Sequence, residues 1–155
     1  NEVSVNLATE VEGEMRYHAC CRSPARLSVN LQVGSAVPVA RTAIGRAFYA
    51  ASSPARQSVI LSNLQQHLST EDYKHAQLAL SDAAEHYRAH GYTVSDGEFS
   101  TDILAVAVGV FDVATGQHAY SLNASVPSAN WQADEYAATI VPKLQALAEK
   151  IGRGI

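Results

Sequence analysis

Apolar and polar residues alternate along the first part of the chain. The alternation runs through residues 3–7, pauses at an acidic segment over 10–14, and resumes over 15–21. A period of two is typical of a strand that buries one face, so the two runs predict a β-hairpin. Residues 27–31 repeat the pattern and predict a third strand before Gly34. The apolar positions that define these strands are Val3, Val5, Leu7, Met15, Tyr17, Ala19, Cys21, Leu27, Val29 and Leu31.

Three helices are predicted next, over residues 42–51, 53–68 and 69–90. Each begins at a hydroxyl residue that can cap the free amide groups of the first turn. The third helix ends where a glycine permits the left-handed backbone that terminates helices. Gly45 is expected at a close-packed turn of the first helix. The start and stop signals are Thr42, Ser53 followed by Pro54, Ser69 with Asp72 three residues later, and Gly91.

A polar loop between two apolar strands follows the third helix. After Gly91 a short strand leads into the loop, and an apolar run over residues 103–111, a turn at 115–116 and a strand that ends at Pro127 complete a second hairpin. Polar groups beside a buried strand are what a ligand pocket uses to orient its ligand. This segment is therefore the first candidate for a binding site.

A final helix is predicted over residues 133–151, where Pro142 should kink it or mark its true start. Its apolar face is expected to consist of Leu144, Leu147, Ala148 and Ile151, and Gly152 follows it. Strands, then helices, then strands and one more helix are typical of an α+β domain with a mostly antiparallel sheet.

Composition narrows the classes of function. The 155 residues are 47% hydrophobic and 17% charged. This composition predicts one domain whose excess apolar surface is buried in an internal cavity or an oligomer interface. The net charge of −4, without a basic cluster, predicts no nucleic-acid binding by this segment alone. No membrane span and no leader peptide are expected, and the adjacent Cys20 and Cys21 suggest free thiols, so a cytoplasmic location is predicted.

Metal and nucleophile chemistry have weak support. His86 and His90 lie four residues apart with Asp82 one turn earlier, a spacing that zinc accepts, but histidine near a helix C-terminus is also favoured by the helix dipole. His18 and Cys20 would share a strand face, and two ligands are too few for a site. We therefore expect no metal and no cofactor.

A catalytic cysteine is a further possibility, but it too is disfavoured. Cys20 and Cys21 are flanked by Arg16 and Arg22, yet a thiol in mid-strand is usually inert packing. The sequence contains no serine elbow and no glycine-rich phosphate loop. We expect no enzyme activity.

Four segments, in order, resemble one protein family. VGSAVPVARTAIGRAFYAA (33–51), YRAHGYTVSDGEF (87–99), ILAVAVGVFD (103–112) and SLNASVP (121–127) are similar to the C-terminal effector-binding domain of the IclR family of bacterial transcription regulators. The resemblance implies a GAF-like fold, a curved antiparallel sheet flanked by helices, over residues 1–155. It also implies that the winged helix-turn-helix domain that binds operator DNA in this family lies outside this chain.

The resemblance implies a pocket for a small organic acid or aromatic metabolite. Family members with carboxylate effectors use a pair of small residues before the helix glycine, an acid in the polar loop, a cysteine that opens the apolar strand, and two hydroxyls at the end of the next strand. The corresponding residues are Ala43, Ile44, Ser95, Asp96, Ala105, Asn123 and Ser125.

Several of these positions depart from the family pattern. Ser95 stands at the position of the acid, with Asp96 one place later, and Ala105 replaces the cysteine. Asn123 and Ser125 replace the paired hydroxyls and share a strand face. Fewer anchoring groups and more room favour an aromatic or larger organic acid. Replacing either residue of the pair by alanine should weaken effector binding with little loss of stability.

Ordinary structural roles remain the alternative for the polar residues. Asn123 and Ser125 can be sheet polar residues, and the polar loop with Ser95, Asp96 and Glu98 can be a turn that caps itself. Arg41 can meet a ligand carboxylate, although an arginine solvated at the helix entry is favoured.

Three function classes stay open on the sequence. The first, and favoured, is a sensing domain that forms a homodimer or tetramer and reaches operator DNA only through the missing domain. The second is a GAF-like enzyme that uses Cys20 or Cys21. The third is a dimerisation scaffold with a vestigial pocket.

Overall fold

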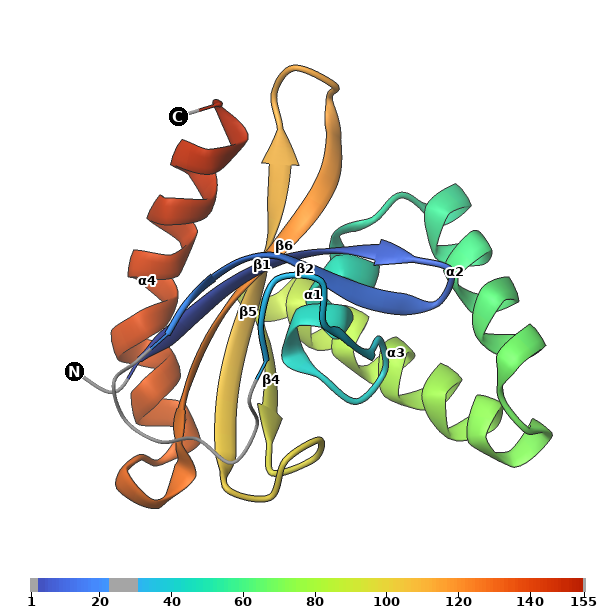
Figure 1. Ribbon diagram of the computed structural model, residues 1–155, viewed down its shortest axis with the longest axis horizontal. Coiled ribbons are helices and arrows are strands. Elements are labelled where there is room, and N and C mark those ends of the chain that lie inside the picture. The colour runs from blue at the N-terminus through green and yellow to red at the C-terminus, as the bar shows by residue number, and fades with distance from the viewer. Residues whose placement is uncertain (1–2, 23–30, 155) are drawn as a thin grey trace.

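The fold is a single curved antiparallel sheet with helices on both faces (Figure 1). The computed structural model describes residues 3–22 and 31–154. The predicted third strand therefore falls mostly outside the described residues, and Leu31 has no regular secondary structure. A different segment, β3 (Ala36–Pro38), pairs with the second strand instead.

Six strands lie in the order β3-β2-β1-β6-β5-β4, and every neighbouring pair is antiparallel. The order places the two predicted hairpins side by side, because β1 pairs with β6 at the centre of the sheet. The remaining strands are β1 (Ser4–Val11), β2 (Glu14–Cys21), β4 (Thr93–Asp96), β5 (Ile103–Asp112) and β6 (Gln117–Pro127).

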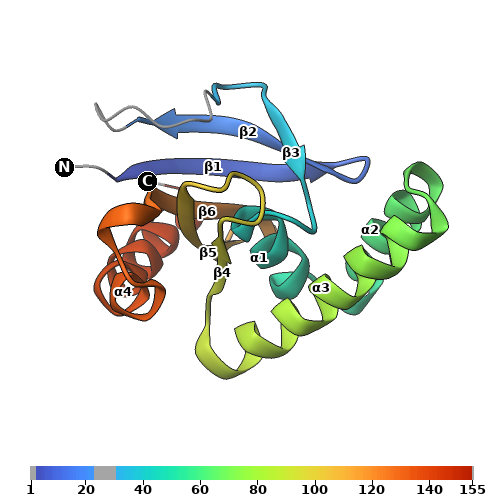
Figure 2. The same cartoon turned by 90° about the horizontal axis from the view of Figure 1, so that it is seen from below.

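Helices α1 (Ala43–Ala51), α2 (Pro54–His67) and α3 (Thr70–His90) confirm the three predicted helices and their caps. Thr42, Ser53 and Ser69 each accept a hydrogen bond from an amide of the first turn. Gly91 adopts the left-handed conformation that ends α3, with φ of 81°. Helices α2 and α3 extend away from the sheet as an arm (Figures 1 and 2).

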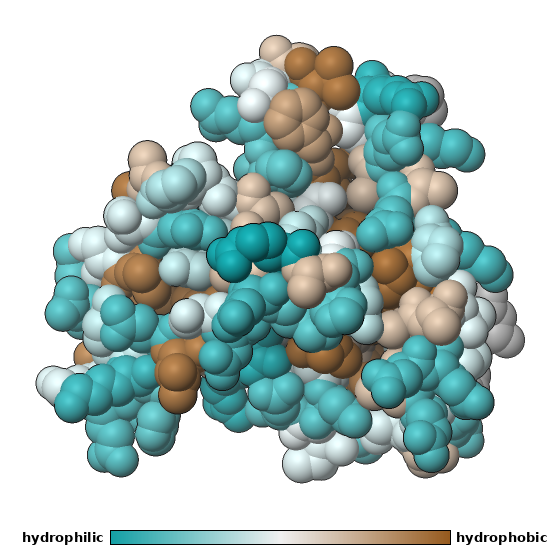
Figure 3. All heavy atoms as spheres, turned by 180° about the vertical axis from the view of Figure 1, so that it is seen from behind, coloured by the Kyte–Doolittle hydropathy of each residue, from teal (hydrophilic) through white to brown (hydrophobic). Residues whose placement is uncertain are grey.

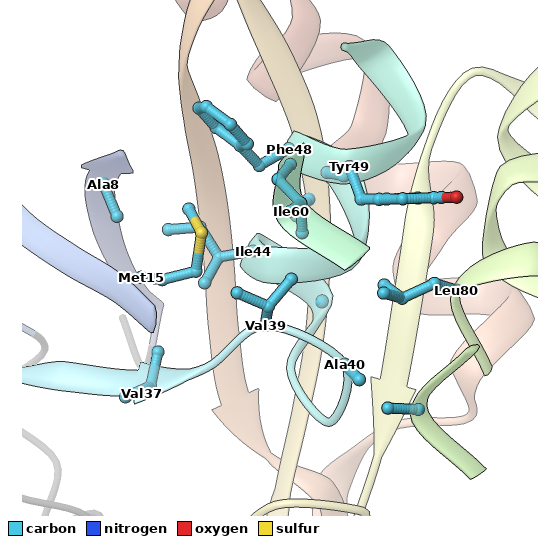
Figure 4. Close-up of a cluster of buried hydrophobic side chains, with 14 of the residues drawn as sticks. Ala8, Met15, Val37, Val39, Ala40, Ile44, Phe48, Tyr49, Ile60 and Leu80 are labelled. Atoms are coloured by element: carbon cyan, nitrogen blue, oxygen red, sulfur yellow. The ribbon is translucent and has the colours of Figure 1, made fainter. Parts of the chain in front are cut away.

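Two apolar cores lie on opposite faces of the sheet. Alternate residues of β5 point to each face, so Ala105 and Ala107 join the core under α1, while Leu104 and Val106 join the core under α4. Figure 2 shows α1 and α4 on opposite sides of the central strands. In the first core, side chains from β1, β2, β3 and α2 converge on α1 (Figure 4).

The first hairpin has the predicted strands, but the buried face of β1 is not the one that its apolar residues predicted. The polar residues Ser4, Asn6 and Glu10 are buried on the α1 side, whereas Val5 and Leu7 pack partly against the α4 core. A register shift between Leu7 and Ala8 also changes the face of the residues opposite them. As a result, Ala19 and Cys21 of β2 are exposed, contrary to the simple alternation.

Glu10 joins this hairpin to α2. Its buried carboxylate accepts hydrogen bonds from the Gly13 amide at 2.6 Å and from Arg56 at 2.7 Å. Arg56 lies on α2 and also stacks over the ring of Phe48, 5.7 Å from its centroid. A buried carboxylate is tolerated when it is paired in this way, so the contact joins strand, turn and helix.

Helix α4 (Ala133–Gly152) runs without interruption through Pro142, so the proline does not mark its start. Leu144 and Ala148 are buried as predicted, but Leu147 is 39% exposed and does not belong to the buried face. At its end, Gly152 touches β5 so closely that an added Cβ would lie 2.0 Å from the carbonyl oxygen of Phe111. The Gly152 carbonyl accepts a hydrogen bond from the Val113 amide at 2.9 Å.

Strand β4 covers only part of β5. Its four residues pair with residues 104–107, whereas β5 continues to Asp112. Beyond β4, the Tyr87 hydroxyl of α3 accepts a hydrogen bond from the Gly109 amide at 3.1 Å. The α3 side chain and the end of α4 thus occupy the edge that β4 leaves uncovered.

Replacing Gly45 by alanine should destabilise the fold by about 3 kcal/mol, because an added Cβ would lie 2.1 Å from the Val39 carbonyl oxygen. Helix propensity alone would instead raise stability by about 1 kcal/mol. Urea unfolding of the wild-type protein and the Gly45→Ala variant shows whether the free energy of unfolding falls or rises. A more stable variant would show that α1 has room to move away from the loop.

Tyr136→Phe should raise the free energy of unfolding by about 1 kcal/mol. The tyrosine is fully buried between α4 and the sheet, and within the described residues its hydroxyl has no hydrogen-bond partner. Tyr17→Phe is the matched control, since the Tyr17 hydroxyl is hydrogen-bonded to Asn123 and its removal should lower stability. Equal effects of both variants in urea unfolding would contradict this difference.

Candidate functional site

The register of the sheet gathers the predicted site residues on the face that α1 covers. Ser95, Ala105 and Ser125 lie opposite one another across β4, β5 and β6, and Ser4 of β1 continues the row. A second row, two residues along each strand, contains Thr93, Ala107, Asn123, Asn6 and Cys20. Residues of one row share a face because side chains alternate along a strand.

Polar side chains in these rows are buried rather than solvated. Asn123 is 6% and Ser125 8% exposed, and Ser95 and Ser4 are similarly buried. They are therefore not solvated surface residues, and Asn123 has an internal partner in Asn6. In the part of the chain that the structure describes, the one buried side-chain polar atom without a hydrogen-bond partner is the Tyr136 hydroxyl, which lies on the other face of the sheet.

Two strand hydroxyls fix the first turn of α1 over this face. Thr93 donates a hydrogen bond to the Ala43 carbonyl and Ser121 donates one to the Ile44 carbonyl, both at 2.7 Å. The Ile44 side chain is fully buried in the core below. Thr42 caps the Gly45 amide, and helix geometry leaves the amides of Ala43 and Ile44 without an intrahelical partner. The side chains of the predicted pair are therefore core residues, and only their backbone amides can meet a ligand.

Asp96 lies apart from the other predicted residues. It follows Ser95 on β4, so its side chain is on the opposite face, and it is exposed. Ser95 is nearer to the helix, with its hydroxyl 3.4 Å from the Arg41 carbonyl oxygen. Asp96 is thus separated from the rows that contain Ser95 and Asn123, and a ligand role for it stays a prediction.

The two arginines nearest the loop are occupied. Arg46 binds Glu98 through two hydrogen bonds of 3.0 and 2.6 Å and also reaches the carbonyls of Ala40 and Val94. The hydrogen bond from Arg46 lowers the pKa of Glu98. Arg41 is exposed and bonds the Glu98 carbonyl at 3.1 Å, which agrees with a helix-entry role. These bonds tie the polar loop to α1, and the loop also bonds to itself, since the Ser100 hydroxyl donates to Asp102 at 3.1 Å.

Asn6 and Tyr17 belong to the site although the sequence did not single them out. Asn6 donates a hydrogen bond from Nδ2 to Asn123 Oδ1 at 2.9 Å. Burial raises the pKa of Tyr17 to about 12, and the side-chain hydrogen bond with Asn123 partly opposes that rise. The available signal was the spacing of Ser4, Asn6 and Glu10, three of the four residues on one face of β1, which indicates a largely polar inner face once β1 is known to pair with β6.

The alternative chemical candidates gain no support. The register shift puts His18 in edge-to-face contact with Tyr120 on the α4 side, while Cys20 packs on the α1 side, so they do not share a face. Burial raises the pKa of Cys20, which disfavours the thiolate that a nucleophile needs. Among the described residues, no three His, Cys, Asp or Glu side chains gather to hold a metal, and His86 and His90 simply stack at 4.6 Å.

A separate hollow of about 340 Å³ opens between α3, β5 and α4. Tyr87, Val108, Phe111 and Ala148 contribute to its lining, and its rim includes the Glu149–Arg153 ion pair. It lies away from the rows of Ser95 and Asn123. On the molecular face shown in Figure 3, hydrophobic atoms form separate patches among hydrophilic ones.

Comparison with known proteins identifies the family. The family model for the C-terminal part of the bacterial transcriptional regulator IclR matches residues 2–153. The chain belongs to the IclR family. No curated protein matches it significantly. The curved sheet and flanking helices are those of the effector-binding domain of IclR regulators, so the expected fold is confirmed.

Solved structures of IclR-type regulators share this fold. An IclR family regulator from Brucella abortus superposes with a TM-score of 0.85 at 23% identity, over 99% of this chain and 57% of that one. The C-terminal domain of Escherichia coli KdgR gives 0.74 at 24%, over 97% and 85%. The inducer-binding domain of Acinetobacter PobR, a double mutant in complex with 3-hydroxybenzoic acid, gives 0.74 at 17%, over 99% and 89%.

The chain spans just under three fifths of the length of the Brucella structure. In the described part of the chain, no helix is long and apolar enough to cross a membrane.

Asn123→Ala and Ser125→Ala should differ in stability, which revises the equal effect expected from sequence. Removing Asn123 leaves the Asn6 amide and the Tyr17 hydroxyl without their partner and should cost about 1–3 kcal/mol. Removing the small Ser125 hydroxyl leaves the Asn6–Asn123 bond in place and should cost less than about 0.5 kcal/mol. Urea unfolding measures both, and equal losses would mean that the Asn6–Asn123 bond contributes nothing.

Proposed function

We propose that this domain senses a small organic acid or aromatic metabolite and binds it on the α1-covered face of the sheet. The observation that carries the proposal is a set of buried polar side chains where a fold of this size would otherwise place apolar ones. Buried polar groups without an internal partner destabilise a protein, and a ligand that bonds them offsets this cost. Ser125, which is 8% exposed, is one of the buried polar side chains that a ligand would bond.

The chemistry of this face favours a ligand with one anionic group and a sizeable neutral body. Arg46 is engaged with Glu98, and Arg56 with Glu10, so neither guanidinium is available to a ligand. A carboxylate would instead meet the amides of Ala43 and Ile44 at the positive end of α1, with Ser95 beside them. Ala105 and Ala107 supply the small floor that admits an aromatic ring.

Ligand binding would act on DNA through a winged helix-turn-helix domain outside this chain. An effector alters operator binding only if it binds two arrangements of the whole regulator unequally. Helix α1 can link the ligand to the rest of the domain. Its first turn faces the proposed pocket, and its core contacts reach β1, β2 and α2. In this proposal the regulator is a homodimer or tetramer in the cytoplasm, and the domain consumes no substrate.

A thermal-shift screen tests this function. The panel contains two- and three-carbon oxoacids, benzoate, and 3- and 4-hydroxybenzoate, the first of these hydroxybenzoates being the compound in the PobR complex. A ligand at 100 times its Kd should add about 2.7 kcal/mol to the free energy of unfolding and raise Tm accordingly. The ligand should be recovered unchanged.

Ser125→Ala should reduce the Tm shift, whereas Thr139→Ala should leave it intact, since Thr139 bonds its own helix on the exposed side of α4. A shift that Ser125→Ala does not affect would place the ligand elsewhere, with the hollow beside α3 as the next candidate. Turnover that Cys20→Ser abolishes would replace sensing by catalysis. No response to a broad metabolite panel would leave the scaffold role.

A further inference from the structure

The wall formed by β1 and β6 carries recognition chemistry that is distinct from the α1 end of the pocket. Asn6 and Asn123 lie directly opposite each other in the register, and both are buried, at 8% and 6% exposure. Their side chains are joined by the 2.9 Å hydrogen bond from Asn6 Nδ2 to Asn123 Oδ1. Tyr17, 4% exposed, holds the other side of the Asn123 carboxamide.

This arrangement fixes which atoms remain for a ligand. A carboxamide offers two N–H donors and an oxygen with two lone pairs. Asn6 uses one donor on Asn123, and no bond to another described residue fills its Oδ1. Asn123 has two N–H groups, and its hydrogen bond with Tyr17 uses at most one of them, so at least one remains. The wall therefore presents an acceptor beside a donor, both held in fixed orientation.

The wall is also uncharged. Its members from the two rows and the adjacent strand are neutral side chains, namely Ser4, Asn6, Tyr17, Cys20, Asn123 and Ser125. The carboxylate of Glu10 is further along β1 and is neutralised by Arg56. A second carboxylate on the ligand would only accept hydrogen bonds and would face the Asn6 oxygen, whereas a hydroxyl donates and accepts at once.

We propose that Asn6, by fixing the orientation of Asn123, makes this wall a recognition site for a neutral hydroxyl group of the effector, remote from its carboxylate. This inference rests on the proposed function and adds to it the chemical class of the ligand, a hydroxy acid. Asn6 and Asn123 select the hydroxyl, and the amides of Ala43 and Ile44 bind the acid.

Calorimetric titration with matched ligands tests the proposal. Benzoate is compared with its 3- and 4-hydroxy derivatives, because each pair differs only in a hydroxyl that lies away from the carboxylate. The protein should bind at least one hydroxy acid about tenfold more tightly than its parent, the factor that one unmade hydrogen bond typically costs. Asn6→Ala should abolish that preference and leave the Kd of the parent acid within about twofold.

Two further variants separate recognition from folding. Thr9→Ala removes a hydrogen bond from the same strand, where the Thr9 hydroxyl donates to the Ala119 carbonyl at 2.8 Å, and should keep the preference. Asn6→Ser keeps a small polar group if the alanine variant does not fold, and should retain part of the preference.

Each remaining result overturns the inference. Equal weakening of both members of a pair by Asn6→Ala, or loss of the preference in Thr9→Ala, would make Asn6 a structural residue only. Binding of the parent acids without any preference would refute hydroxyl recognition and leave sensing intact. Binding of none of these acids would refute the hydroxy-acid class, and the broader screen would then decide the proposed function independently.

Discussion

The close approach of α1 to the sheet determines the rest of this domain. Gly45 brings the helix backbone against Val39, and β5 offers only Ala105, Ala107 and Gly109 on the facing side. Hydroxyls from β4 and β6 then bond directly to carbonyls in the first turn of the helix. These polar contacts add to the apolar core that packs Ile44 and Phe48 of the same helix. Small residues and hydroxyls are needed for this approach. The same hydroxyl residues make the adjoining part of the face polar.

The sequence predicted elements well where the signals are local. The caps at Thr42, Ser53 and Ser69 and the stop at Gly91 depend on side chains within one turn of the helix end, and all four are confirmed. Which face a strand buries depends on distant partners. The register shift after Leu7 could not be read from β1 or β2 alone, and it reversed the expected faces of the last residues of β2.

The same distinction applies to the site. Asn123 and Ser125 were expected to share a face because side chains alternate along a strand. Ser95 and Ala105 were chosen from the resemblance to a known family, and the register of the sheet places both opposite Ser125. Asn6 was missed because its partner is 117 residues away. Asp96 was misplaced because a shift of one residue along a strand reverses the face. The hydrogen-bonding character of this face was therefore only half visible before the pairing of β1 with β6 was known.

The uncovered end of β5 has a consequence for the behaviour of the molecule in a crowded cell. A bare strand edge is a template on which another chain can add its own strand, the first step of irregular aggregation. Here the Tyr87 hydroxyl occupies the Gly109 amide, and Gly152 lies against Phe111, so much of that template is already engaged. The β5–β6 hairpin can thus extend from the domain while few of its edge groups remain open to strand pairing with another molecule.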